Sequence, residues 1–359
     1  MTDAAFPPVV KTGLADWFRK HFFATWYDTI FSLIFAALIF WSLQAFIGWA
    51  VLDAIWRVEN KDLCTRDAGA CWAVIESRGR LILFGLYPYE EQWRSTLACL
   101  AIIVTIALSC LPRFWSIRRL PTLWIAGFGT FVLLMRGGLA GLEVVTSEQW
   151  GGLSLTIFIF SGVFVIGMPL AVVFALARRS SLPVIAKSFG LLIDIVRSLP
   201  LLTILFAAAV IVPLLVPEWL QGNKLMRVVV AFAVFFAAYQ AEIIRAGLQS
   251  TSQGQEEAAV ALGMPYWSLV VDILLPQAFR NTLPSTINQA VITFKETSIV
   301  TIIGFFEVMA SGNAAIGTGE WGNQYIEVYV FLALIYFVFV FGLSRYGAWL
   351  ENRMRLGHA

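Results

Sequence analysis

Charged side chains are scarce in this sequence. Only 13% of its 359 residues are Asp, Glu, Lys or Arg, whereas soluble domains typically carry about 25%. The formal net charge is +2, with no block of basic residues interleaved with aromatics, which argues against a nucleic-acid partner. Apolar residues make up 59% of the chain, the mean hydropathy is +0.78, and there are 29 Phe and 14 Trp. The composition therefore predicts a membrane protein whose surroundings are lipid.

The residue types and motifs of enzymes are also missing. Histidine occurs only at His21 and His358, both near a terminus, and no serine lies in a G-x-S-x-G pattern. We therefore expect no metal site, no cofactor and no catalytic centre. The nearest approach to the phosphate-binding pattern G-x4-G-K-[ST] is Gly222-Asn223-Lys224, so the chain is not expected to hydrolyse ATP. A channel or an ion-driven transporter is the alternative class, but the paired inverted repeats that would favour it are not visible.

The N-terminal segment lacks the features of a cleavable signal peptide. Residues 1–28 contain Lys11, Asp16, Arg19, Lys20 and His21, and no short apolar core precedes a small-residue cleavage site. The first apolar run, 29–52, contains no charge. It is long enough to span a bilayer and to remain as an anchor.

Eight segments are predicted to cross the membrane. They are residues 29–55, 95–112, 120–136, 153–177, 188–216, 225–246, 284–306 and 325–345. The third is short, because only 16 residues separate Arg119 from Arg136. The fifth to eighth segments contain charged residues, which indicates the interior of a helix bundle rather than contact with lipid.

The distribution of Lys and Arg predicts the orientation of the chain. Basic residues gather at both termini and in the loops after the second, fourth and sixth segments, which places these parts and both termini in the cytoplasm. One loop disagrees, because residues 57–94 contain six basic residues although the helix count places them outside. The agreement of the other loops outweighs this conflict.

The four cysteines fall into two pairs. Cys99 and Cys110 lie in an apolar stretch and are expected to be inert packing residues. Cys64 and Cys71 enclose the polar loop TRDAGA, which suits a disulfide in an oxidising compartment. A zinc site is the alternative, but no second Cys/His pair accompanies this one, so we favour the disulfide.

Residues 249–281 form a polar stretch that is too long for a simple turn between two spans. The S-x-x-Q spacing of Ser252 and Gln255 predicts a capping box at the start of a helix. Gly263 should end that helix in a left-handed conformation. Pro265 suits the first position of a second helix, which should run over 266–274 until Leu275-Pro276 interrupts it. Physical reasoning thus predicts a cytoplasmic helix–turn–helix whose flat alanine face allows a partner to approach closely.

This stretch resembles the EAA motif of ABC importer permeases, E-A-A-x3-G-x9-I-x-L-P. The matching residues are Glu257, Ala258, Ala259, Gly263, Ile273, Leu275 and Pro276. The alternative is a chance amphipathic loop. A pattern that matches at every position across 20 residues, in a loop predicted to be cytoplasmic, argues against that alternative.

Three further stretches resemble polar amino-acid permeases. They are residues 197–202 (R-S-L-P-L-L, against R-G-T-P-L-L), 238–247 (A-Y-Q-A-E-I-I-R-A-G, against A-A-Y-x-A-E-x-x-R-G-G) and 295–298 (K-E-T-S, against K-D-T-S). The departures are Ser198 in place of the usual Gly and Leu199 in place of the usual Thr. Together with the EAA motif, the resemblance covers residues 150–355 and extends to the long permeases of general L-amino-acid importers.

The resemblance implies a fold and an organisation. The expected fold is an all-α polytopic membrane protein with about eight transmembrane helices. Residues 150–359 would form the five-helix core of a type I ABC importer permease, with its coupling loop at 249–281. Residues 1–149 would form an extension of three helices with the cysteine loop outside.

The resemblance also implies the partners. In such importers the EAA loop is seated in a groove of a separate ATPase, so Glu257, Ala258, Ala259, Gly263 and Pro276 are the expected ATPase-coupling residues. Closure of an ATPase dimer would move two such loops and switch the transport cavity by alternating access. One chain has one loop, so a second permease, identical or homologous, is expected, and a homologous one in a heterodimer is favoured. A periplasmic amino-acid-binding protein and the bacterial inner membrane complete the assembly.

Polar residues inside the seventh segment are the candidates for the substrate pathway. Gln289 and Thr293 are four residues apart and share a helix face, whereas Lys295 and Glu296 are adjacent and point in different directions. Intramembrane polar groups usually face a water-filled route, although hydrogen bonds between helices explain them equally well. Arg197 is a further candidate.

Two other charged pairs have helical spacing. Glu242 and Arg245, and likewise Asp194 and Arg197, lie three residues apart and can share a helix face. The first pair is expected to be structural rather than in contact with a ligand, and the second to be structural or gating, both near the cytoplasmic interface. Pro200 and Pro213 should break or kink the fifth span, which would free backbone groups that a neighbour or a cavity must satisfy.

Overall fold

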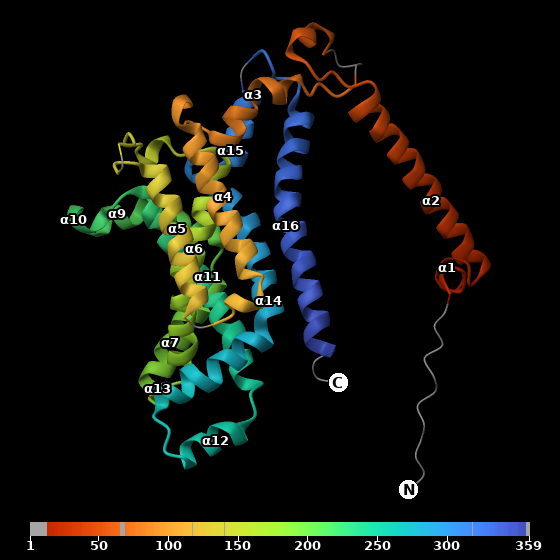
Figure 1. The fold of residues 1–359 in the computed structure, drawn as a ribbon. Coiled ribbons are helices and arrows are strands. Elements are labelled where there is room, and N and C mark those ends of the chain that lie inside the picture. Colours follow the sequence, from red (N-terminus) through yellow and green to blue (C-terminus); the bar gives the residue numbers. More distant parts are fainter. Residues whose placement is uncertain (1–12, 65–68, 117, 140, 318, 357–359) are drawn as a thin grey trace. The chain divides into compact units, whose positions relative to one another are not determined.

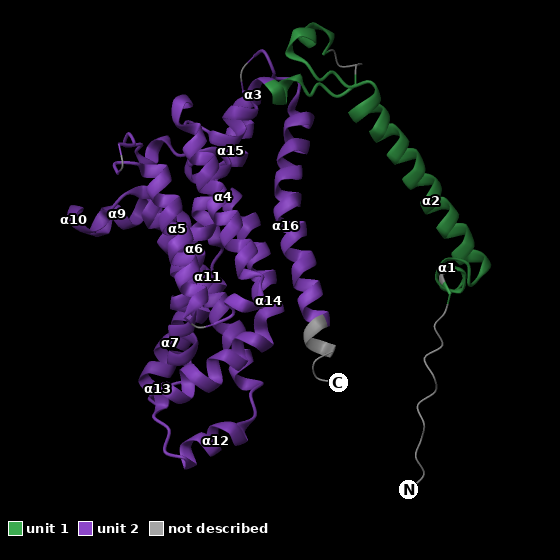
Figure 2. Ribbon diagram, viewed as in Figure 1, with its two compact units in different colours: residues 1–76 green, residues 77–359 purple. Residues whose placement is uncertain are grey.

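The computed structural model describes residues 13–64, 69–116, 118–139, 141–317 and 319–356. Its regular elements are helices, and two isolated β-bridges, Ile55 with Cys71 and Gly152 with Glu307, are the β-pairings among these residues. The chain divides into two compact units, residues 1–76 and 77–359 (Figure 2). Each unit is described by itself. The predicted boundary near Trp150 separates the N-terminal extension from the permease core. It does not coincide with this division and stays a prediction.

The N-terminal unit is built on one long apolar helix. Its elements are α1 (Leu14–Phe22), α2 (Trp26–Ile47), the π-helical turn η1 (Gly48–Leu52) and the 3-10 helix η2 (Val58–Leu63). Thr25 and Asp28 form a capping box that starts α2. None of the residues of α2 is buried, so its apolar surface is left open within this unit.

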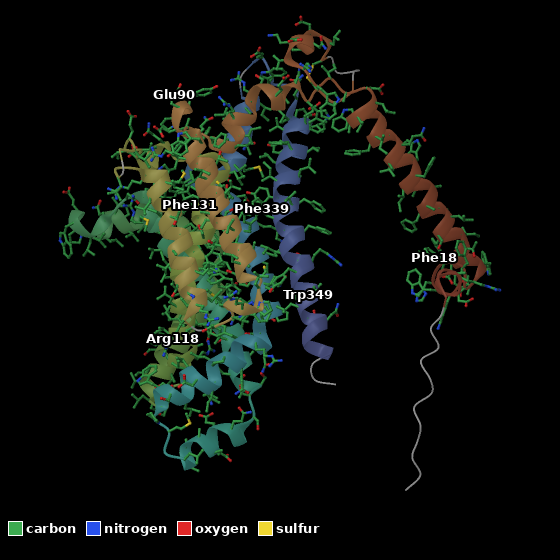
Figure 3. All side chains as sticks on the ribbon, in the orientation of Figure 1. Phe18, Glu90, Arg118, Phe131, Phe339 and Trp349 are labelled. Atoms are coloured by element: carbon green, nitrogen blue, oxygen red, sulfur yellow. A yellow bond between two sulfur atoms is a disulfide. The ribbon has the colours of Figure 1, made fainter. Side chains whose placement is uncertain are left out.

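The N-terminal part of the second unit consists of two long helices and their connections. Its elements are α3 (Ala73–Phe84), which begins in the first unit, η3 (Tyr89–Glu91), α4 (Gln92–Ser109), η4 (Pro112–Phe114), α5 (Arg119–Arg136) and η5 (Ser147–Gln149). Phe131 of α5 (Figure 3) is fully buried and stacks on Phe158 of α6, with 5.9 Å between the ring centroids. Helices α4 and α5 therefore belong to the same packed body as the following helices.

The remaining elements of this unit form the bundle seen in Figure 1. They are α6 (Gly152–Arg178), α7 (Pro183–Ser198), α8 (Leu201–Phe206), η6 (Ala207–Ile211), α9 (Val212–Leu215), α10 (Glu218–Gln221), α11 (Lys224–Gln249), α12 (Gln253–Ala261), α13 (Tyr266–Ser268), η7 (Leu269–Leu274), α14 (Leu275–Glu296), η8 (Thr297–Ile303), α15 (Val308–Ile316) and α16 (Tyr325–Leu356).

Close packing of α6, α11 and α14 forms the centre of the bundle. A Cβ atom at Gly167 of α6 would lie 2.6 Å from the Phe236 ring of α11, and one at Gly247 of α11 would lie 2.6 Å from the Ala278 carbonyl of α14. These helices approach so closely because glycine leaves no side chain in the contact. The buried core residues Phe232 and Phe236 fill the space beside these contacts.

The structure is consistent with eight membrane-spanning segments in the described part of the chain. Five helical segments are long and apolar enough to span: Trp26–Leu52, Tyr89–Ser109, Gly152–Arg178, Lys224–Gln249 and Tyr325–Asn352. A sixth is the bent pair Pro183–Ser198 and Leu201–Leu215, which turns by 104° at Pro200. Helix α5 lies at the predicted third position, and α14 covers residues 284–296 of the predicted seventh segment, which continues as η8. The predicted all-α polytopic fold is confirmed.

Two prolines are accommodated by π-helical turns rather than by helix breaks. The sequence predicts that Leu275-Pro276 interrupts a helix, and this prediction is wrong: helical structure runs from Tyr266 to Glu296, with the π turn η7 directly before Pro276. The π turn η6 likewise precedes Pro213. A wider turn absorbs the missing N–H and the steric demand of the proline ring.

The backbone freed by Pro213 has a neighbour, as the sequence predicts. The carbonyl of Ala209, four residues earlier, has no N–H from Pro213 to accept. The Arg227 side chain of α11 donates to the Ala209 carbonyl at 3.4 Å and to the Ala208 carbonyl at 3.2 Å. The guanidinium thus replaces the lost helical hydrogen bond and ties the bent fifth span to α11.

Candidate coupling loop and substrate pathway

The loop predicted to couple to an ATPase lies at one end of the bundle. Figure 1 shows α12 there, beyond α7 and α13, with α15 at the opposite end. Gly263 has a φ of +71°, and the Gly263 and Met264 N–H groups donate to the carbonyls of Val260 and Ala259 at 2.9 and 3.0 Å. These two bonds and the left-handed glycine make a Schellman motif that ends α12. The sequence-based prediction of this helix end is confirmed.

Helix α12 starts directly after Ser252, as predicted, but without the predicted cap. The Ser252 side chain makes no capping hydrogen bond, so the predicted capping box is wrong. The Gln255 side-chain oxygen instead accepts from the Gln277 side-chain amide at 2.7 Å, because η7 and α14 return beside α12. The next helix, α13, begins at Tyr266 as predicted, and Pro265 is its N-cap rather than its first helical residue.

The surface of the loop is small and apolar around one acid. Glu257 and Ala258 are exposed, whereas Ala259 is buried against the bundle. Large apolar side chains project beside them: Val260, Leu262, Tyr266 and Trp267 are each more than half exposed. The rest of the chain does not cover these side chains, so this surface is suited to insertion into a groove of another protein.

Polar contacts attach the loop to the rest of the bundle. Glu256 forms an ion pair with Arg179, which follows α6. The Asn281 side chain of α14 donates to the Ser250 hydroxyl, just after α11, at 3.0 Å. Together with the Gln277–Gln255 bond, these contacts link α12 to the end of α6 and to α14, and α14 to the end of α11. A displacement of α12 is therefore passed to the membrane part by more than the backbone alone.

A charged cluster joins α6, α7 and α11 near this end of the bundle. Glu242 lies 2.8 Å from Arg245, 3.2 Å from Arg178 and 3.9 Å from Arg197, and its side chain is 15% exposed. The predicted Glu242–Arg245 pair is present. The predicted pairing of Asp194 with Arg197 is wrong, because Asp194 pairs with Arg178 at 2.9 Å. Asp194 and Arg197 of α7 therefore each pair with a residue of another helix, Arg178 of α6 and Glu242 of α11, rather than with each other.

The candidate pathway residues of α14 do not all gather in one place. Gln289 and Thr293 are both buried, and the Thr293 hydroxyl donates to the Gln289 backbone carbonyl at 2.8 Å. Lys295 is exposed and Glu296 is half-buried. Arg197 contacts Glu242 and lies over the Tyr239 ring at 5.2 Å. The structure therefore keeps Gln289 and Thr293 as one face and places Arg197 in the charged cluster.

The buried face of α14 has a partner that the sequence analysis missed. Gln240 of α11 is fully buried, and its amide donates to the Thr286 hydroxyl of α14 at 2.8 Å. Thr286, Gln289 and Thr293 recur at helical spacing, which is the signal that would have included Thr286. The side-chain oxygen of Gln240 has no hydrogen-bond partner among the described residues.

A second missed residue is Glu307, which is fully buried at the N-terminus of α15. Its carboxylate accepts from the N–H groups of Met309 and Ala310 at 2.9 and 3.0 Å, from the Thr301 hydroxyl, and from the Thr156 hydroxyl of α6 at 3.3 Å. Burial raises the pKa of Glu307 above its ordinary value, although these hydrogen bonds act in the opposite direction. Glu307 thus holds α6, η8 and α15 together.

Cys64 and Cys71 are joined by a disulfide in the structure. Next to Cys71 the Trp72 indole donates to the Ala50 carbonyl at 2.8 Å, which ties this residue to η1. No group of three or more His, Cys, Asp and Glu side chains suited to a metal ion occurs among the described residues.

The structure is thus a bundle of membrane-spanning helices from which a helix–turn–helix projects. Residues 167–356, more than half of the chain, match the family "Binding-protein-dependent transport system inner membrane component". The chain belongs to this family. It is therefore the inner-membrane permease of an ABC transport system, which works with a separate ATPase and a substrate-binding protein, and ATP hydrolysis is the role of the ATPase.

Two relatives match almost the full length of the chain. The "Inner membrane amino-acid ABC transporter permease protein YhdY" of Escherichia coli K12 is 37% identical and covers 95% of this chain and 93% of its own. The "Glutamate/glutamine/aspartate/asparagine transport system permease protein BztC" of Rhodobacter capsulatus is 30% identical and covers 98% and 96%. The solved "Crystal structure of an amino acid ABC transporter with histidines" has 31% identity, covers 56% and 92%, and gives a TM-score of 0.49.

Proposed function

We propose that this chain is a permease subunit of an ATP-driven importer that carries L-amino acids across the bacterial inner membrane by alternating access. The two full-length relatives are both amino-acid permeases by name, which supports this substrate class. The observation that carries the proposal is the loop after α11. Its exposed Glu257 and Ala258, followed by the left-handed Gly263, have the residue types and shape of the coupling helix in such importers.

The proposed assembly contains two permeases, an ATPase dimer and a periplasmic amino-acid-binding protein. One chain presents one coupling loop, so a second permease is needed, and we propose a homologous partner in a heterodimer. Both termini and the coupling loop 249–281 would lie in the cytoplasm, with the disulfide loop outside. The positive-inside distribution supports this orientation.

The contacts of the loop suggest how ATPase closure reaches the substrate pathway. Movement of α12 would pull on α6 through Glu256–Arg179 and on α14 through Gln255–Gln277. The charged cluster around Glu242 would keep the inner ends of α6, α7 and α11 together during this movement. Since α14 also carries Gln289 and Thr293, we propose that these residues line the pathway or its dimer interface.

Gln289 suits a permease with broad specificity. An uncharged amide can hydrogen-bond the common groups of many amino acids without demanding one side-chain charge. A permease devoted to cationic amino acids would be expected to place a carboxylate at such a position. We therefore propose uptake of several L-amino acids rather than of one charge class.

The test is purification of the tagged chain from its own membranes, with identification of its partners, followed by uptake in proteoliposomes that contain the whole complex. We expect an ATPase and a second permease to co-purify, and uptake of labelled L-amino acids to require ATP and the binding protein. Uptake that proceeds without ATP would show a channel or an ion-driven transporter. ATP-dependent uptake of another solute, with none of amino acids, would refute the substrate class.

A further inference from the structure

Helix α1, the nine-residue element before the first span, has two different sides. With 3.6 residues per turn, Trp17, Phe18 and Phe22 project on one side, and Asp16, Arg19 and Lys20 on the other. The Phe18 and Phe22 rings stack with 5.5 Å between centroids, and Trp17 stacks on His21 at 4.7 Å. These i, i+4 contacts show that the aromatic side chains form one continuous surface.

This aromatic surface is not covered by protein. Trp17 is 43%, Phe18 52% and Phe22 39% exposed, and Figure 3 shows Phe18 projecting from the helix. The charged side chains on the opposite side are exposed as well. A short helix with large aromatics on one side in water would be unfavourable, because each exposed aromatic side chain forfeits the free energy of burial.

The angle between α1 and α2 indicates what covers this aromatic surface. Figure 1 shows α1 almost end-on while α2 is seen along its length, so α1 runs across the axis of α2. The Ser32 hydroxyl donates to the Phe22 carbonyl at 2.9 Å, and the capping box of Thr25 and Asp28 starts α2 within four residues of α1. If α2 crosses the bilayer, a helix that crosses its axis at one end lies in the plane of the membrane surface.

We propose that α1 is an in-plane anchor, with its aromatic side in the acyl-chain boundary and Arg19 and Lys20 at the level of anionic lipid headgroups. The charges support this partner, because Arg19 and Lys20 outnumber Asp16 and an anionic membrane surface attracts basic residues. Stable protein interfaces bury about 1,200 to 2,000 Å² in total, more than one side of a nine-residue helix offers. Interfacial helices typically have this pattern of aromatics and bases.

The inference rests on the proposed cytoplasmic N-terminus, since the inner leaflet is the more anionic side. It assigns α1 the role of fixing the depth and tilt of α2 in the bilayer. Free phosphate would not serve in place of lipid, because it offers nothing to the aromatic side.

The test is spin-label accessibility in the whole complex, reconstituted in nanodiscs of phosphatidylcholine with or without phosphatidylglycerol. Cys99→Ala and Cys110→Ala remove the free thiols, and a label is placed at Phe18→Cys or Lys20→Cys. Oxygen concentrates in lipid, whereas a nickel complex stays in water. We expect the label at position 18 to be several-fold more accessible to oxygen than to the nickel complex, and the label at position 20 to show the reverse. Phe22→Cys and Asp16→Cys form a second pair in case one variant does not assemble.

The charged side is tested with Arg19→Gln/Lys20→Gln in the Phe18→Cys background. Phosphatidylglycerol should deepen the label in the parent and have no effect in the double variant. Equal water access at positions 18 and 20 would overturn the proposal, and so would shielding of position 18 from both reagents, which would show a protein contact. Uptake measured on the same samples separates the two claims, because uptake without lipid contact refutes only the anchor, and lipid contact without ATP-dependent uptake refutes only the transport function.

Discussion

Replacement of Gly263 tests the coupling loop most directly, because the structure separates its conformational role from steric contact. Gly263 has a φ of +71°, and an added Cβ would have no atom within 4 Å. Gly263→Ala therefore creates no clash inside the chain, and its effect is the strain of a left-handed residue, about 1 to 2 kcal/mol. A change of this size shifts the population of the capped turn by about 5- to 30-fold. The helices of the membrane part should be unaffected, since the loop projects beyond them.

The assay is ATP-dependent amino-acid uptake by the reconstituted complex, together with the amount of ATPase that co-purifies. We expect Gly263→Ala to insert normally and to lose most of its uptake, because the turn that presents Glu257 to the ATPase is rarely formed. Gly263→Asn should retain more uptake than Gly263→Ala, since asparagine tolerates the left-handed conformation better. Gly141→Ala is the matched control, because Gly141 has a φ of +79° and equally open space outside the coupling loop.

Two results would refute this reasoning. Normal uptake by Gly263→Ala would mean that the left-handed turn is not needed for coupling. An equal loss in Gly141→Ala would mean that positive-φ strain lowers the stability of the whole protein rather than uncoupling one loop.

The remaining predictions concern Glu307, Gln289 and the disulfide. Burial raises the pKa of Glu307 from its ordinary value of 4.5, so the folded state holds this proton to a higher pH than the unfolded state, and the stability of the fold is lost as pH rises above about 4.5. Glu307→Gln should flatten this part of a profile of Tm against pH. Parallel profiles for the variant and the parent would disprove this role of Glu307. Gln289→Glu should depress uptake of labelled glutamate more than of arginine, since only a cationic substrate can pair with the new carboxylate, whereas equal losses would indicate helix packing alone. An impermeant thiol reagent should label Cys64 or Cys71 in intact cells only after reduction, and protection even then, with labelling after lysis, would place the loop inside.

The sequence alone determined the class of protein and the two ends of helix α12. The apolar composition and the long uncharged runs require lipid, because no soluble fold could cover that surface. Gly263 ends α12 as predicted, since a helix terminus depends on residues a few positions apart. The Glu242–Arg245 pair was predictable for the same reason, as both residues lie on one turn of α11.

Only the tertiary structure decided which distant groups meet. Asp194 pairs with Arg178 of another helix rather than with its own neighbour Arg197. The hydroxyl of Thr156 reaches Glu307 across 151 residues of sequence, and the Ala209 carbonyl freed by Pro213 finds Arg227. The π turn before Pro276 keeps one helical path where the local pattern predicts two helices. Burial strengthens such contacts and penalises unpaired polar groups, so the packing of α6, α11 and α14 selects partners that no local spacing encodes.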